Sequence, residues 1–149
     1  MPKKTRNNRY TLKVYPDRMS RIAYRVFEIS GSENLDTLCE AILICFDFSM
    51  EHMFEFSLDG RLYTDDNIIC ETDGRQRTTD HVTIDQLNLA KGSKFWLHYD
   101  FGDDWIFVIT VQKVEEAETV ESPKLLRGKG EVKQYPDWDD DDDEDEDWF

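Results

Sequence analysis

A chain of 149 residues with 39% hydrophobic and 13% aromatic residues has enough apolar material for one folded domain with a single core. Its net charge of −15 is unevenly placed: residues 137–149 hold ten acids and no base, which leaves −5 for the rest of the chain. That balance disfavours nucleic acid as a partner, and no apolar run approaches the ~20 residues of a membrane span or the core of a secretory signal.

The first nine residues form a basic segment without strand or helix periodicity, and we expect a flexible arm there. Its four cations are Lys3, Lys4, Arg6 and Arg9. A frayed, solubilising terminus is the favoured interpretation of this segment. Direct DNA binding through the four cations is the alternative, and it predicts an affinity that falls steeply with salt. The folded domain would then occupy residues 10–136.

Two strands and one helix are predicted at the start of this domain. Residues 10–15 alternate between apolar and polar, and residues 21–29 are rich in β-branched and aromatic side chains. Across residues 35–46 the apolar positions instead recur at spacings of three and four, which is typical of an amphipathic helix. Asn34 or Ser32 would cap the start of this helix. It is expected to be the main helix of the domain.

The next segment returns to strand alternation over residues 53–58. Asp59-Gly60 follows directly and favours a tight hairpin turn, so we predict a return strand that begins at Arg61. Residues 64–81 are polar and predict a long surface connection. This part of the chain therefore contributes a second hairpin to the sheet.

A short helix is predicted after this connection, because Thr83 and Gln86 have the spacing of a capping box. Apolar residues through Leu87 or Leu89 would form its buried side, and Gly92 would end it. At the far end of the domain, residues 123–136 give either one more strand or an irregular clasp. The sequence does not decide between these two.

Residues 95–111 form the stretch around which the domain is organised: two alternating apolar runs joined by an acidic turn. One face of this hairpin carries Phe95, Leu97, Tyr99, Trp105, Phe107, Ile109 and Val111. We predict that Gly102 adopts a positive φ in the turn and that the flanking aspartates accept hydrogen bonds from turn amides. Valine at position 102 would then strain the backbone.

The order of predicted elements is two strands, a helix, two strands, a short helix and a final hairpin. We therefore predict an α+β domain: a mostly antiparallel sheet built from hairpins, with one principal helix and one short helix. Its opening elements resemble those of a β-grasp fold.

One motif in the hairpin resembles the signature of a known family. Its residues are Phe95, His98, Tyr99, Asp100, Phe101, Gly102, Asp103 and Trp105. The chain resembles the plasmid pRiA4b ORF-three-like family, which includes proteins carried by insertion elements and plasmids, over residues 10–136. The resemblance implies no established biochemical activity.

Other segments support the resemblance, and some depart from it. Supporting segments are Tyr10-x-Leu12-x-Val14, Tyr24-Arg25, Phe46-Asp47-Phe48 and His52-Met53-Phe54-Glu55-Phe56. Phe54 and Phe107 stand where the family has histidines, and Gly128, Gly130 and Pro136-Asp137 are what remains of its later Cys-Gly and Pro-Pro-Glu-Asp segments. The two lost histidines argue against metal or acid–base chemistry at that place.

Four residues form the candidate site: His52, His98, Asp100 and Asp103. Imidazole and carboxylate groups are ligands for zinc and similar ions, and aspartates also serve as acids and bases. His98 and Asp100 lie two apart and would share one face of a strand. The structural interpretation, in which the histidines are hydrogen-bonded and the aspartates cap the turn, is favoured. We assign no metal, cofactor or catalytic residue.

The acidic segment 137–149 is expected to be disordered, because its charges repel and it buries little. A solvated tail is the default interpretation of this segment. Trp138, Trp148 and Phe149 are unusual in such a tail and suit docking onto a basic, partly apolar partner, and mimicry of a nucleic-acid phosphate track is a further alternative. Cys39, Cys45 and Cys70 lack disulfide or zinc spacing, which favours reduced thiols in the cytoplasm. The leading hypothesis is a non-enzymatic protein-binding module, with a metal-dependent factor or enzyme as the alternative.

Overall fold

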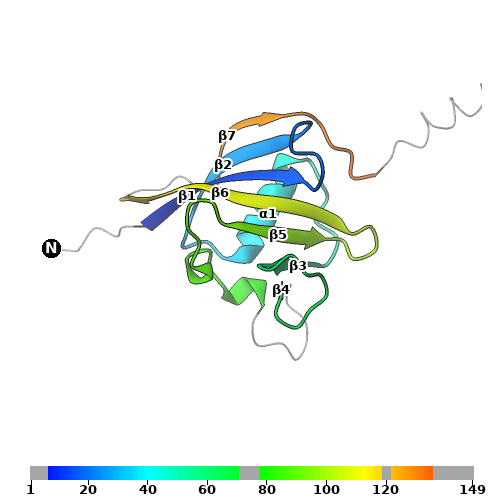
Figure 1. Ribbon diagram of the computed structural model, residues 1–149, viewed down its shortest axis with the longest axis horizontal. Coiled ribbons are helices and arrows are strands. Elements are labelled where there is room, and N and C mark those ends of the chain that lie inside the picture. The colour runs from blue at the N-terminus through cyan, green and yellow to red at the C-terminus, as the bar shows by residue number, and fades with distance from the viewer. Residues whose placement is uncertain (1–6, 71–77, 119–121, 136–149) are drawn as a thin grey trace, which may run out of the picture.

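The computed structural model describes residues 7–70, 78–118 and 122–135 and shows one seven-stranded antiparallel sheet (Figure 1). The strands are β1 (Asn7–Pro16), β2 (Tyr24–Ser30), β3 (Phe54–Ser57), β4 (Ile68–Ile69), β5 (Lys94–Tyr99), β6 (Trp105–Ala117) and β7 (Lys124–Lys129). Their order across the sheet is β4-β3-β5-β6-β1-β2-β7, so β4 and β7 are its two edges.

The predicted central hairpin is confirmed. β5 pairs antiparallel with β6, from Tyr99 opposite Trp105 at the turn to Lys94 opposite Thr110. The face predicted to be apolar is buried in the core, and six of its side chains are at most 1% exposed: Phe95, Leu97, Tyr99, Phe107, Ile109 and Val111. β6 then continues along β1, which brings the first strand into the middle of the sheet.

The predicted first strand extends further than its sequence pattern indicated. β1 begins at Asn7, so the last three residues of the expected arm belong to the sheet. Arg9 of β1 forms ion pairs with Glu28 of β2 at 3.5 Å and with Glu115 of β6 at 3.2 Å. This cation of the proposed DNA contact is therefore engaged by two carboxylates of the sheet. Lys3, Lys4 and Arg6 lie outside the described residues.

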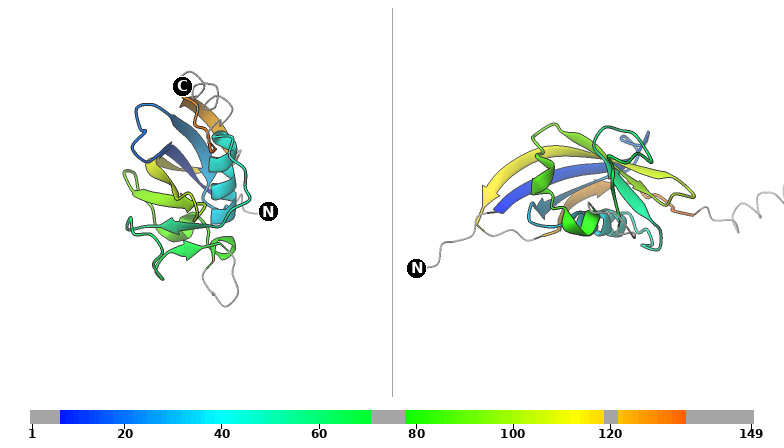
Figure 2. Two further views of the ribbon diagram at one scale, coloured as in Figure 1. Left: turned by 90° about the vertical axis from the view of Figure 1, so that its right-hand side faces the viewer. Right: turned by 90° about the horizontal axis from the view of Figure 1, so that it is seen from below.

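The principal helix is confirmed as α1 (Leu35–Cys45), which lies across one face of the curved sheet (Figure 2). Asn34 caps it, because its side-chain oxygen accepts a hydrogen bond from the amide of Thr37 at 2.9 Å. Its buried residues recur at helical spacing: Leu35, Leu38, Cys39, Ala41, Ile42 and Leu43. They form one core with the inward side chains of the sheet. None of the helices in the described ranges is long and apolar enough to cross a membrane.

The predicted fold class is wrong. The segment expected to form a short helix is a three-residue 3₁₀ turn, η2 (Asp85–Leu87), like η1 (Thr79–His81) before it. The capping box does form, but Asn88 adopts φ 56° and ends the turn at once. The described residues thus form a large antiparallel sheet with one α-helix, which is not an α+β domain with two helices. A β-grasp opening is also wrong, because β1 pairs antiparallel with β6 where a β-grasp has a parallel central pair.

The hairpin predicted at Asp59-Gly60 is also wrong in its return strand. Gly60 does adopt a positive φ of 79°, but β3 pairs with β4, which begins at Ile68. Residues 58–67 instead form a connecting loop. The final segment begins as a strand, β7, and continues as irregular residues 130–135 that contact Ser49 and His52. The acidic residues 137–149 lie outside the described part of the chain.

Candidate functional site

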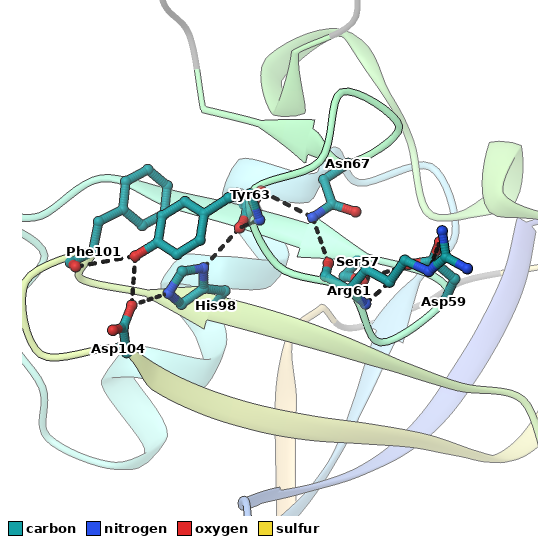
Figure 3. A network of polar contacts seen from close by, with 9 residues as sticks. Ser57, Asp59, Arg61, Tyr63, Asn67, His98, Phe101 and Asp104 are labelled. Atoms are coloured by element: carbon teal, nitrogen blue, oxygen red, sulfur yellow. Dashed lines mark hydrogen bonds and ion pairs between the residues drawn. The ribbon is translucent and has the colours of Figure 1, made fainter.

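The central feature of the candidate site is a fully buried histidine held between two carboxylates. His98 lies on β5 with its side chain on the face of the sheet opposite α1, and it is 0% exposed. Its Nδ1 is 2.7 Å from Glu55 Oε2, and its Nε2 is 2.6 Å from Asp104 Oδ1 (Figure 3). The pair is set by strand register, because Glu55 of β3 lies directly opposite His98.

Glu55 connects this histidine to the loop that covers it. The carboxylate is buried and accepts hydrogen bonds from the Tyr63 amide at 2.8 Å and the Asn67 side chain at 3.0 Å. Asn67 also donates to the carbonyl of Arg61 at 2.7 Å (Figure 3). These bonds hold residues 58–67 over β3.

When the carboxylates of Glu55 and Asp104 are both ionised, the hydrogen-bond geometry determines which ring nitrogens of His98 carry a proton. An ionised carboxylate is only an acceptor, so both ring nitrogens of His98 must donate, as in an imidazolium. One cation then lies between the carboxylates of Glu55 and Asp104, which satisfies the buried charge of Glu55. With both nitrogens engaged, this ring offers no open position to a substrate or metal ion.

Tyr63 closes the outer side of the network. Its hydroxyl donates to Asp104 Oδ1 at 2.6 Å and to the carbonyl of Phe101 at 3.1 Å. The contact with Asp104 raises the pKa of Tyr63 to about 12. The Tyr63 hydroxyl and the His98 ring in turn lower the pKa of Asp104 below its ordinary value of 3.8. Between Tyr63, Phe101 and the carboxylate of Glu55 there is a small cavity of about 110 Å³.

The lowered pKa of Asp104 predicts an acid-sensitive contribution to stability. A carboxyl group whose pKa is lower in the folded chain stabilises the fold above its unfolded pKa, and this is lost as the pH falls through the folded pKa. We expect acidification from about pH 4 to about pH 2 to lower the free energy of unfolding less in Asp104→Asn than in the unmodified protein. Urea unfolding at several pH values measures this. The same pH profile for both proteins would contradict it.

The other predicted residues form a separate contact on the α1 side of the sheet. His52 Nε2 is 2.7 Å from the Tyr135 hydroxyl and 3.5 Å from Asp100 Oδ2. The Tyr99 hydroxyl accepts a hydrogen bond from the His52 amide at 3.2 Å and donates to the carbonyl of Ser49. Burial raises the pKa of Tyr99. This contact joins the turn of the central hairpin to the segments before β3 and after β7.

His52 and Tyr99 also line a cavity of about 210 Å³ at the side of α1. Its other lining residues are Asp36, Cys39, Glu40, Leu43, Met50, Phe54 and Cys70. Burial raises the pKa of the Cys39 thiol well above its usual range, so the thiol stays protonated. All three cysteines are free thiols. Within the described ranges, no group of three or more His, Cys, Asp and Glu side chains has an arrangement that could hold a metal ion.

The signature turn differs from its sequence prediction in two respects. Gly102 does not adopt a positive φ; Asp100 at 67° and Asp104 at 52° do. Of the two aspartates expected to cap the turn, Asp100 does so: its Oδ1 accepts hydrogen bonds from the amides of Gly102 at 3.0 Å and Asp103 at 3.3 Å, whereas Asp103 contributes its backbone amide. Aspartate tolerates the left-handed region because its short side chain bonds to nearby amides.

This turn geometry reverses the expected effect of substitution. A Cβ at position 102 would meet only Asp100 Oδ1, at 3.3 Å, so Gly102→Ala is expected to change the unfolding free energy by less than about 0.5 kcal/mol. Asp100→Ala removes the acceptor and keeps a side chain at positive φ, which is expected to cost about 1–3 kcal/mol. Thermal unfolding of both variants tests this. A larger loss for Gly102→Ala than for Asp100→Ala would contradict it.

The structure thus brings His52 and Asp100 together and places His98 on the opposite face of the sheet. Asp103 is exposed and contributes its backbone amide to the turn. Besides Asp104, the His98 network contains three residues that sequence reasoning missed: Glu55, Tyr63 and Asn67. Glu55 had one visible signal, an acid between two phenylalanines of a predicted strand. Tyr63 and Asn67 had none, because they reach the network from a loop.

The fold and the site together define the class of protein. It is an antiparallel-sheet domain with one α-helix among the described residues, in which a buried histidine–carboxylate network holds the signature turn against the sheet. The family model of the plasmid pRiA4b ORF-3-like protein matches residues 8–135. The chain belongs to this family, and the resemblance of the signature motif is confirmed.

Comparison with solved structures supports the fold. The chain is similar to the crystal structure of the protein of unknown function MM3350 from Methanosarcina mazei Go1, with a TM-score of 0.72. The two are 22% identical, and the match covers 87% of this chain and 74% of the other. No curated protein matches the chain. The arrangement of the sheet is therefore shared with a protein of low sequence identity.

Proposed function

We propose that this protein acts by binding another protein and that residues 137–149 form its contact segment. The observation that carries the proposal is the composition of this segment: ten acids, no base and three aromatic residues within 13 positions. Such a segment attracts a basic surface over a distance through its charge, and its aromatic side chains then bury apolar area on contact. The partner we propose is a basic, partly apolar protein surface.

The geometry of the signature motif supports this proposal over the alternative, a catalytic or metal-binding site at the turn. Both ring nitrogens of His98 are engaged by carboxylates, and Asp100 is 6% exposed and bonded to turn amides. These groups serve to hold a loop and a hairpin in place. We therefore do not propose a metal-dependent or enzymatic role for His52, His98, Asp100 and Asp103.

Capture from a cell lysate with immobilised full-length protein tests the proposal. One variant replaces Trp138, Trp148 and Phe149 with serine and keeps every acid; a second replaces the five aspartates at 139–143 with asparagine and keeps every aromatic residue. We expect the unmodified chain to capture basic proteins that are released by salt, and both variants to lose them. Recovery of the same proteins on all three chains, or of none on any, would sink the proposal.

A further inference from the structure

The edge strand β7 is the most exposed element of the sheet. It pairs with β2 on one side, and each of its residues from Lys124 to Lys129 is exposed. Two of its side chains are large and apolar: Leu125 is 55% and Leu126 is 41% exposed. An exposed edge strand with apolar side chains is a template for pairing with another extended segment.

The charge of β7 indicates which kind of extended segment would pair with it. Its sequence, Lys-Leu-Leu-Arg-Gly-Lys, contains three cations and no acid. The strand is therefore basic and partly apolar, which is the chemistry that the acidic and aromatic residues 137–149 are suited to bind. The chain carries both halves of a complementary pair.

The course of the chain after β7 allows the two halves to meet. The Arg25 guanidinium donates to the carbonyls of Lys129 and Gly130 at 2.8 Å and fixes the end of the strand. Gln134 then accepts a hydrogen bond from the Ser49 amide, and the Tyr135 hydroxyl contacts His52. Fourteen residues follow Tyr135, and they span up to about 46 Å when extended. The six residues of β7 span about 20 Å, so the segment has ample length to return along them.

We propose that residues 137–149 dock onto β7 of their own chain, with acids against its cations and tryptophan against Leu125 and Leu126. The short tether favours this contact over one with a second molecule, because it gives an effective concentration in the millimolar range. The proposal rests on the proposed function in that the same segment binds the partner. A basic partner must then displace it from β7, which makes the contact autoinhibitory.

Zero-length carbodiimide cross-linking of the full-length protein tests this, because the reagent joins a lysine amine to a carboxylate in direct contact. Equal amounts of unlabelled and ¹⁵N-labelled protein are mixed, and linked peptides are identified by mass spectrometry. We expect links from Lys124 and Lys129 to residues 137–147 within one isotope population, with loss of these links at high salt. Links that join the two isotope populations would assign the contact to a second copy and overturn the proposal.

Matched charge variants show whether the contact is specific to β7. Arg127→Glu keeps both reactive lysines, and we expect it to reduce the links about fivefold, since one attraction becomes a repulsion. Lys91→Glu makes the same change in net charge before β5 and should leave the links unchanged. The 139–143 asparagine variant, which alters no residue of the sheet, should reduce them as well. Equal linking to Lys91, Lys94 and the β7 lysines, or no links, would overturn the proposal while leaving the lysate result to decide the proposed function.

Discussion

Replacing His98 with leucine is expected to lower the free energy of unfolding by about 3–5 kcal/mol, because it leaves the carboxyl group of Glu55 buried without its partner at 2.7 Å. Glu55 is 2% exposed. Urea unfolding followed by circular dichroism measures the loss. His81→Leu is the matched control: its side chain is 71% exposed, so the change should stay within about 0.5 kcal/mol.

A double variant separates the unpaired charge from lost packing. Glu55→Gln carries no charge, and its one amide oxygen can accept from either the Tyr63 amide or the Asn67 side chain, because these two groups bond to different oxygens of Glu55. Combined with His98→Leu, it should cost less than the sum of the two single variants, by about 0.5–3 kcal/mol. Strict additivity would show that the histidine contributes through its volume and not through the ion pair.

Replacing Phe107 with alanine is the second change with a large expected effect, about 3–5 kcal/mol. Its ring is 0% exposed and lies 5.3 Å from the ring of Phe46 and 5.4 Å from that of Phe48, measured between centroids. Trp105 stacks beside it at 6.2 Å. Alanine would leave a cavity where the end of α1 meets the hairpin, and the surrounding rings relax only in part.

Thermal and urea unfolding of Phe107→Ala measure the effect, with Ile44→Ala as the control. Ile44 lies on α1 but is 62% exposed, so its truncation should change the free energy of unfolding by less than about 0.5 kcal/mol. Similar losses of unfolding free energy for Phe107→Ala and Ile44→Ala would contradict the prediction that Phe107 fills a tightly packed part of the core.

Sequence periodicity predicted the elements whose signal is long and regular. The alternation in β5 and β6 identified the buried face of the hairpin, and the three-and-four spacing identified α1. Both signals work because an amphipathic element must place its apolar face on a core. The same reasoning failed where backbone geometry changes over one residue: Asn88 ends the expected short helix by adopting a positive φ.

The four candidate residues do not lie together as one group, for a related reason. Side chains two apart share a face only while the strand remains extended, and Asp100 leaves the strand at φ 67°. His98 and Asp100 therefore bond to different partners on opposite faces of the sheet. The true neighbours of His98 come from β3 and from the turn, and strand register, which a single sequence does not contain, brings Glu55 to it.

The two edges of the sheet are unequal, since β4 has two residues and β7 has six. A strand of two residues offers too few backbone groups to nucleate further pairing, so only one border is receptive to an incoming chain. Among the residues that the structure describes, molecules that join through β7 would therefore have no second edge strand of comparable length from which to extend the sheet. We expect such pairing to stop at two copies and not to continue into a fibril.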